Sequence, residues 1–375
     1  MFYILKLIAK TISTFSKTFN IGSGYTWPGH IILKLYPNIL KDKKIIFKKG
    51  IILISGTNGK TTTSKLLAHI LRNQGYSVLH NQTGANLLNG IVACITLDGK
   101  FPIDYGVFEC DEFALPQIIK ELSPTCLVLL NLSRDQLDRY GEVDIIFERW
   151  QNAFKELSSD TTIIADREQD KFSNLGEIFS GRVLYFDANE QFLAKSNLKG
   201  SFNAKNINAS LMVNTFFNLD HEQAVLSLAS FGAAYGRGEV ITYKNVNFKI
   251  YLAKNPASFN RNLALTFDEE HDAILCILND KIPDGRDVSW IYDIDPIKLY
   301  DFCNEYDLYV SGSRCLDMAI RLNYSQVKIN KDNVVSSLYE ATQKIIKNGK
   351  RNVIVFPNYS AMLEFRKVLI GRKIL

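Results

Sequence analysis

The sequence predicts an α/β protein with two successive domains, each built on a mainly parallel sheet. Three observations lead to this prediction. The chain has 375 residues, which is long for a single domain. From about residue 46, short apolar runs alternate with helical patterns, and the alternation pauses at a glycine-rich segment, 231–238, before it starts again. The apolar runs are nearly continuous, which is typical of parallel strands covered on both faces.

Residues 1–45 are predicted to form a leader, made of an amphipathic helix followed by an irregular arm that is rich in glycine and proline. Lys6, Lys10 and Lys17 interrupt the apolar residues of the helix. The uncharged stretches are therefore too short to cross a membrane, and the pattern is not that of a signal peptide. We expect no transmembrane segment, and a helix that either packs on the protein or lies on a membrane surface.

Residues 46–235 are predicted to form the first α/β domain, and residues 236–375 the second, smaller one. In the first domain we expect strands at Ile51–Ile54, Ser77–Leu79, Tyr105–Glu109, Cys126–Leu130 and Thr161–Ala165, with helices that include Thr62–Asn73 and Ile145–Leu157. In the second we expect strands at Phe248–Leu252, Ala273–Leu278, Leu308–Val310 and Val353–Phe356, and helices near Asn260–Leu265, Leu316–Leu322, Val334–Lys347 and Ala361–Leu369.

Composition and charge exclude several classes of protein. Hydrophobic residues make up 46% of the chain and charged residues 22%, as in an ordinary globular protein. A net charge of +5 argues weakly for an anionic ligand or a membrane surface and gives no case for nucleic-acid binding. The six cysteines have no C-x-x-C spacing, so we expect free thiols and no zinc site.

The most informative motif is Gly-Thr-Asn-Gly-Lys-Thr, which follows the apolar run Ile51–Ile54 and precedes a helical pattern. A strand, a glycine-rich turn and a helix start, in this order, make a cradle for phosphate groups. Lys60 would reach the terminal phosphates of ATP, and the Thr61 hydroxyl would ligate Mg²⁺. The general P-loop has a further glycine where this chain has Ile54, so the motif is a shorter variant. The predicted nucleotide-binding residues are Gly56, Thr57, Asn58, Gly59, Lys60, Thr61 and Thr62.

Acidic residues follow the predicted strand Tyr105–Glu109. Ligands of open α/β sheets bind at the carboxyl ends of the strands, where Glu109 lies, with Asp111 and Glu112 just beyond it. Glu109 would complete the Mg²⁺ shell together with Thr61. The alternative is a solvated acidic turn.

Two further polar segments are candidates for ligand contacts. Residues 131–140 follow a strand directly and offer many hydrogen-bonding groups, which suit a polyanionic ligand or a structural capping network. In the second segment, 200–209, Asn203 and Asn206 are three residues apart at a helix start and therefore share one face. Their amides suit adenine, with helix capping as the alternative.

These motifs resemble the signatures of the Mur ligase superfamily, in the same order along the chain. The phosphate loop, segment 131–140 and segment 200–209 match its central domain, and Gly236–Glu239 resembles its Gly-Arg-x-Glu turn. Within the superfamily, the segments 134–142, 252–257 and 284–290 are most similar to the MurT family. The fold implied is a Mur ligase central P-loop domain followed by a smaller Rossmann-like domain.

The resemblance implies a carbon–nitrogen ligase of peptidoglycan synthesis that uses ATP and Mg²⁺ to amidate the D-glutamate of lipid II through an acyl phosphate. Arg237 would lie near the phosphates. The partner would be a GatD-type glutaminase that forms a heterodimer with this chain and supplies ammonia. Asp287, in preference to Asp284, would complete the partner's catalytic triad, and the catalytic set would be Asp287, Lys60 and Glu109. The enzyme would work in the cytoplasm or at the inner face of the cell membrane.

Two departures separate this chain from amino-acid-adding Mur ligases. Gln136 stands where most of them carry a metal-binding histidine, and Trp150-Gln151 stand where they carry a carbamylated lysine. The MurT family is similar to this chain at both places. Many MurT proteins also carry a four-cysteine zinc ribbon, but residues 161–200 contain no cysteine. The alternatives are a stand-alone amino-acid ligase of the folylpolyglutamate or Mur kind, and a non-catalytic ATP-binding partner protein.

Overall fold

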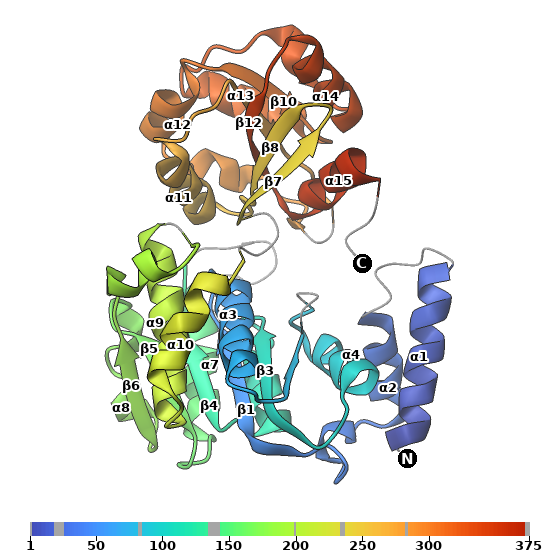
Figure 1. Ribbon diagram of the computed structural model, residues 1–375, viewed down its shortest axis with the longest axis vertical. Helices are drawn as coiled ribbons and strands as arrows, with labels where there is room; N and C mark the ends of the chain where they lie inside the picture. Colours follow the sequence, from blue (N-terminus) through green and yellow to red (C-terminus); the bar gives the residue numbers. More distant parts are fainter. Residues whose placement is uncertain are drawn as a thin grey trace. The chain divides into compact units, whose positions relative to one another are not determined.

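The computed structural model describes residues 2–18, 26–81, 85–133, 143–198, 200–232, 237–281 and 284–371. The described residues up to 232 form one compact unit, and those from 237 onward form another (Figure 1). Both units are α/β, which confirms the predicted fold class. The predicted boundary at 235/236 lies outside the described residues. Within the described residues, none of the helices is long and apolar enough to cross a lipid bilayer.

The first unit is built on a six-stranded sheet whose strands all run parallel. Their spatial order is β2-β3-β1-β4-β5-β6. The strands are β1 (Phe47–Ser55), β2 (Val78–His80), β3 (Ile103–Cys110), β4 (Cys126–Leu129), β5 (Thr162–Asp166) and β6 (Arg182–Phe186). The five predicted strands of this domain are confirmed, and β6 is an additional one. The central position of β1 places the residues after it at the middle of the sheet's carboxyl edge.

Helices cover both faces of this sheet. They are α3 (Lys60–Asn73), α4 (Leu88–Asp98), α5 (Leu115–Leu122), α7 (Val143–Lys155), α8 (Leu175–Ile178), α9 (Ser201–Phe216) and α10 (His221–Ser227). Ile52 and Ile54 of β1 pack in one apolar cluster with Leu67 of α3 and Val213 of α9. Leu53 points to the opposite face and is fully buried as well. The continuous apolar run that predicted a parallel strand is explained by this two-sided burial.

The N-terminal segment is part of the first unit. Helices α1 (Phe2–Thr18) and α2 (Thr26–Leu35) pack on each other and on α4. The prediction of an irregular arm after the first helix was wrong, because α2 occupies it. Pro28 lies in the first turn of α2, where no N–H donor is needed. A Cβ on Gly29 would meet the carbonyl oxygen of Asn89 at 1.7 Å, so the glycine serves helix packing.

The second unit has a mixed six-stranded sheet, in which only β7 runs antiparallel to its neighbour. In spatial order its strands are β11 (Val334–Val335), β10 (Asp307–Ser311), β9 (Ala273–Ile277), β12 (Asn352–Pro357), β8 (Val246–Tyr251) and β7 (Arg237–Tyr243). The helices are α11 (Pro256–Thr266), α12 (Pro296–Cys303), α13 (Cys315–Tyr324), α14 (Leu338–Lys347) and α15 (Tyr359–Ile370). The four predicted strands of this domain are confirmed.

One predicted helix of the second domain was wrong in its first turn. The sequence predicts a helix over Val334–Lys347, but Val334 and Val335 pair with β10 as a short strand. The helix begins only at Leu338, after Ser337, whose side chain accepts a hydrogen bond from the N–H of Glu340. Two β-branched residues followed by a serine cap favour this division.

Candidate nucleotide-binding site

The phosphate loop lies between β1 and α3, at the carboxyl edge of the first sheet. Its two glycines adopt positive φ angles, +138° at Gly56 and +92° at Gly59. A Cβ on Gly56 would stand 2.8 Å from the backbone N and O of Asn131, and one on Gly59 would stand 2.4 Å from Asn206 Oδ1. The loop therefore needs glycine at both positions for backbone conformation and for space.

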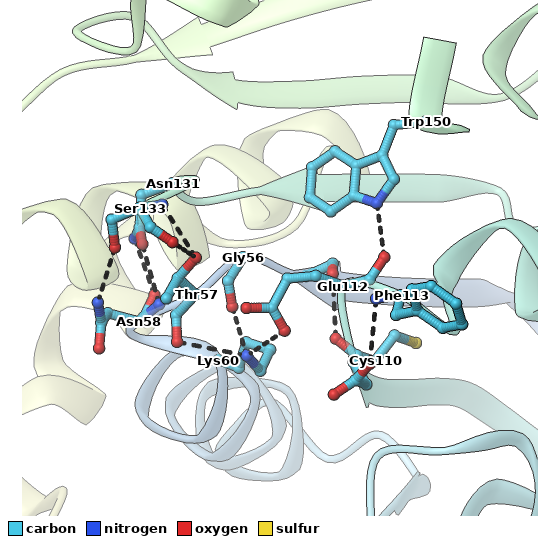
Figure 2. A network of polar contacts seen from close by, with 12 residues as sticks. Gly56, Thr57, Asn58, Lys60, Cys110, Glu112, Phe113, Asn131, Ser133 and Trp150 are labelled. Atoms are coloured by element: carbon cyan, nitrogen blue, oxygen red, sulfur yellow. Dashed lines mark hydrogen bonds and ion pairs between the residues drawn. The ribbon is translucent and has the colours of Figure 1, made fainter. Parts of the chain in front are cut away.

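The end of β4 clamps the loop from one side. Asn131 Oδ1 accepts a hydrogen bond from the Asn58 N–H at 2.9 Å, and Asn131 Nδ2 donates to the Asn58 carbonyl at 2.8 Å (Figure 2). The Thr57 N–H donates to the Asn131 carbonyl, and the Ser133 N–H donates to Thr57 Oγ1 at 3.0 Å. These bonds fix the loop before any ligand arrives, which lowers the conformational entropy lost on binding. The structure thus places Asn131, which the sequence singles out within a polar segment, directly against the predicted phosphate loop.

Lys60 is the first residue of α3, and its ammonium group is buried beside the loop. Nζ lies 2.8 Å from Glu112 Oε2 and also donates to the carbonyl oxygens of Gly56 and Thr57 (Figure 2). The residue exposures are 8% for Lys60 and 5% for Glu112, so water screens this ion pair little. A phosphate entering the loop would compete with Glu112 for the ammonium group. In the sequence, Glu112 is one of three neighbouring acidic residues. No sequence pattern indicates that it pairs with Lys60, which is 52 residues away.

The two predicted metal ligands lie on neighbouring elements of the first unit. Glu109 is on β3, next to β1 in the sheet, and is 2% exposed. Asn81 fixes its backbone by accepting from the Glu109 N–H and donating to the Glu109 carbonyl, both at 3.0 Å. Thr61 is the second residue of α3 and is partly exposed.

Carboxylate and hydroxyl oxygens are the donors that Mg²⁺ prefers. In the part of the chain that the structure describes, no group of three or more His, Cys, Asp or Glu residues forms a metal site. A Mg²⁺ ion held by Thr61 and Glu109 would therefore take its other ligands from phosphate and water, as is usual for this ion. The residues fit this kind of site, and the two ligands stay a prediction.

The first turns of α9 lie against the loop and against the end of β5. Asn206 Oδ1 accepts from Thr63 Oγ1 at 3.1 Å, and its Nδ2 donates to Asn203 Oδ1 at 2.9 Å. The amide of Asn206 thus holds α9 to α3 and forms the floor under Gly59. Lys205 bonds to Asp166 at 2.8 Å and anchors the same turn to the sheet. Contact of Asn203 and Asn206 with adenine stays a prediction, and the structure adds a positioning role for Asn206.

Trp150 of α7 is fully buried next to the ion pair. Its indole Nε1 donates to the backbone carbonyl of Glu112 at 2.7 Å (Figure 2). Trp150 therefore fixes the backbone that carries the counterion of Lys60. The sequence marks this position only as a departure from other ligases, because a tryptophan on an amphipathic helix reads as an ordinary core residue.

The two predicted triad candidates of the second unit differ in environment. Asp284 is 5% exposed, and its carboxylate accepts the Ser360 N–H at 3.0 Å, at the start of α15. Burial raises the pKa of Asp284, although the N–H donors of α15 oppose this. Asp287 is exposed, and hydrogen bonds from the Ser289 N–H and hydroxyl lower its pKa. The side chain of Arg237 and the segment 134–140 lie outside the described residues.

Comparisons with known proteins agree with this geometry. The family profile described as "Mur ligase middle domain" matches residues 54–232, and the profile "MurT ligase C-terminal" matches residues 252–362. The "Lipid II isoglutaminyl synthase (glutamine-hydrolyzing) subunit MurT" of Staphylococcus aureus strain COL is 28% identical, and the alignment covers 90% of this chain and 91% of that protein. The protein of the same name from Streptococcus pneumoniae is 23% identical, with 94% of each chain covered.

Solved structures show the same fold at low sequence identity. MurF ligase of Thermotoga maritima, solved with ADP, has a TM-score of 0.68 at 19% identity and covers 92% of this chain and 85% of its own. Folylpolyglutamate synthase of Mycobacterium tuberculosis, solved with ADP and AMPPCP, has a TM-score of 0.66 at 14% identity and covers 92% of this chain and 95% of its own.

The phosphate loop, the sheet order and the second α/β unit define a ligase of the Mur type. The match of the second unit to the MurT C-terminal profile, and the similarity to MurT subunits over nearly the whole length, narrow the class. The chain is MurT-like: it combines a match to the Mur ligase middle domain with a match to the MurT ligase C-terminal domain.

Proposed function

We propose that this chain is the ligase subunit of an enzyme that amidates the α-carboxyl group of D-glutamate in the stem peptide of lipid II, with ATP as the energy source. The observation that carries this proposal is the occurrence in one chain of a preformed phosphate loop around Lys60 and a MurT-type C-terminal domain. The named function of the MurT relatives supports the same reaction.

The loop and Lys60 would supply the electrostatic part of the reaction. A carboxylate is a poor electrophile, so its oxygen first attacks the γ-phosphorus of ATP, and ADP leaves. The loop N–H groups and the ammonium of Lys60 stabilise the charge on the transferred phosphoryl group. Mg²⁺ bound to Thr61 and Glu109 would neutralise further phosphate charge. Ammonia then attacks the acyl carbon of the acyl phosphate and forms the C–N bond. The C–O bond to phosphate breaks, phosphate leaves with its electron pair, and the nitrogen loses a proton to give the amide.

The nitrogen source in this proposal is a GatD-type glutaminase subunit. Ammonium has no lone pair and cannot attack, and only a small fraction of it is present as ammonia at neutral pH. A bound partner that releases ammonia is therefore a more effective nitrogen source than an ammonium salt in solution. The MurT relatives are named as subunits of a glutamine-hydrolysing enzyme, which supports a partner of this kind. Asp287 is the better candidate for orienting the partner's catalytic histidine, because it is exposed and its pKa is lowered by the Ser289 N–H and hydroxyl. The carboxylate of Asp284 already accepts the Ser360 N–H at the start of α15.

The test is mass spectrometry of lipid II incubated with the purified chain, ATP, Mg²⁺ and ammonium, without a partner. We expect the mass change for replacement of OH by NH₂, and its loss in Lys60→Ala. If ammonium gives no product, the glutaminase subunit and glutamine are added. No product under either condition would refute the proposal, and transfer of an amino acid in place of ammonia would identify a stand-alone ligase.

A further inference from the structure

The outward face of α1 is apolar, which is unusual for a surface helix. Phe2, Leu5 and Ala9 are buried on the side that packs against α2 and α4. On the opposite side, Ile4 is 61% exposed and Leu7 67%. A helix that packs on a water-soluble core normally carries polar residues on its outer face.

This outward face forms a single stripe. Each of Ile4, Leu7, the half-buried Ile8, Thr11 and Phe15 lies three or four residues from another member of the set, which keeps all five on one side of the helix. Phe15 is 55% exposed. In Figure 1, α1 lies beyond α2 and α4 at the margin of its unit. We call these five residues the α1 stripe.

Lysines border the α1 stripe. Lys10 is exposed, and Lys44 Nζ lies 4.4 Å from the ring centre of Tyr3 at the start of the helix. Lys6 donates to the Gly99 carbonyl; burial, and then repulsion from Lys10 and Lys100, lower its pKa. The positive charges of this region are thus close enough to interact.

The charge of the whole segment has the same sign. Residues 1–50 contain nine lysines and one acidic residue, Asp42, whereas the rest of the chain has a small excess of acidic side chains. The net charge of the protein is therefore concentrated in the segment that contains the α1 stripe. Helix α2 adds Trp27, which is 50% exposed, and tryptophan is a side chain favoured at membrane–water interfaces.

We propose that the α1 stripe docks on the surface of a bilayer that contains anionic phospholipids. The stripe would insert at the boundary between headgroups and acyl chains, and the lysines would contact the lipid phosphates. An apolar helix face edged by lysines has the chemistry of an interfacial helix. A second copy of the chain fits less well, because two such faces would bring like charges together. The inference rests on the proposed function for its setting, since lipid II is anchored in a membrane.

Vesicle co-sedimentation of the full chain tests the proposal, with phosphatidylcholine vesicles that contain or lack phosphatidylglycerol. We expect binding to the anionic vesicles that falls as salt is added. The variant Leu7→Ser/Phe15→Ser should lower the bound fraction on the order of tenfold, because two inserted side chains are lost. Its matched control is Leu226→Ser/Leu316→Ser, where the leucines are 69% and 67% exposed elsewhere. Lys10→Glu/Lys44→Glu should also release the chain, and Lys120→Glu/Lys347→Glu should not.

Three outcomes would overturn the proposal. The chain could fail to bind anionic vesicles, or the stripe and control variants could bind equally well. A wild-type dimer that Leu7→Ser/Phe15→Ser turns into a monomer would make a second copy the occupant. Amidation of detergent-solubilised lipid II, measured in parallel, distinguishes failure of membrane docking from failure of the proposed function. The stripe variant should keep that activity, whereas failure of the reaction itself would abolish it in every variant, including those that bind vesicles.

Discussion

Lys60 Nζ lies 2.8 Å from Glu112 Oε2, and both side chains are buried at the carboxyl edge of the first sheet. Removing one member of a buried pair leaves the other charge without compensation, which costs more than the net value of the pair. In the proposed reaction the phosphates of ATP would take over as the counterion of Lys60. The pair thus links the stability of the free protein to occupancy of its loop.

Glu112→Gln should lower the free energy of unfolding by about 3 kcal/mol, since the buried Lys60 ammonium loses the carboxylate that lies 2.8 Å from it. Added nucleotide should raise the melting temperature more in this variant than in the wild type, because phosphate replaces the missing charge. Thermal denaturation with and without AMPPNP measures both effects. Glu340→Gln is the control, because Glu340 pairs with Lys344 at an exposed helix face. Equal nucleotide effects in wild type and Glu112→Gln would show that phosphate does not replace Glu112.

Gly59→Ala should abolish nucleotide binding, because its Cβ would come within 2.4 Å of Asn206 Oδ1 under the loop. Gly75→Ala is the matched control: Gly75 also has a positive φ, +83°, but a Cβ there has nothing within 4 Å. The control should cost about 1 kcal/mol of backbone strain and leave binding intact. Titration calorimetry with ATP and Mg²⁺ compares the two. Similar affinities would mean that α9 can retreat from the loop.

Asp287→Asn should stop amidation with glutamine and leave amidation with ammonium unchanged, if Asp287 orients the partner's histidine. The fold should persist, because the side chain is exposed and bonds only locally to Ser289. Asp284→Asn should instead destabilise the second unit by about 1–3 kcal/mol, since it weakens the acceptor for N–H groups of α15. Rates with the two nitrogen sources, together with melting curves, distinguish these roles. Equal loss with both sources in Asp287→Asn would refute its assignment.

His80 should make the protein less stable in mild acid. It is buried at the end of β2 with Nε2 3.0 Å from Ser64 Oγ, and burial lowers its pKa from 6.5 to about 3. The unfolded chain binds a proton below pH 6.5, and the folded state does not, so stability present above pH 6.5 is lost as the pH falls toward 3. This contributes a loss of about 2 kcal/mol between pH 7 and pH 5.

Urea denaturation at several pH values measures this effect. His80→Gln should flatten the pH dependence in that interval, whereas His221→Gln, at an exposed position, should not. Parallel curves for wild type and His80→Gln would assign the acid sensitivity to other groups.

Local sequence patterns predict much of the fold, but they do not predict contacts between residues that are far apart in sequence. The strands around Ile52, Val107 and Val128 are evident because two-sided burial makes each an unbroken apolar run. The prediction fails at α2 and β11, where packing on Asn89 and pairing with β10 override the local glycine, proline and helix signals. In each case a residue far away in sequence decides the local structure.

The candidate site divides in the same way. The phosphate loop is readable because its function needs a fixed spacing of Gly56, Gly59 and Lys60 within one turn. The sequence does not predict the other contacts of the site, because each depends on how separate strands and helices come together. These contacts are the ion pair of Glu112, the hydrogen bond of the Trp150 indole and the hydrogen bonds of Asn131 to the loop. The total charge of +5 also hides the lysine-rich segment 1–50, which contains the α1 stripe.

The position of Asn206 under Gly59 has a consequence for folding during synthesis on the ribosome. Asn206 bonds to Thr63 across 143 positions of sequence, so the loop has its full support only after α9 has been made and has docked. The motif that is easiest to recognise in the chain is thus finished late in synthesis. A nascent chain that ends before α9 should not retain ATP, which delays nucleotide capture until the first unit can close around it.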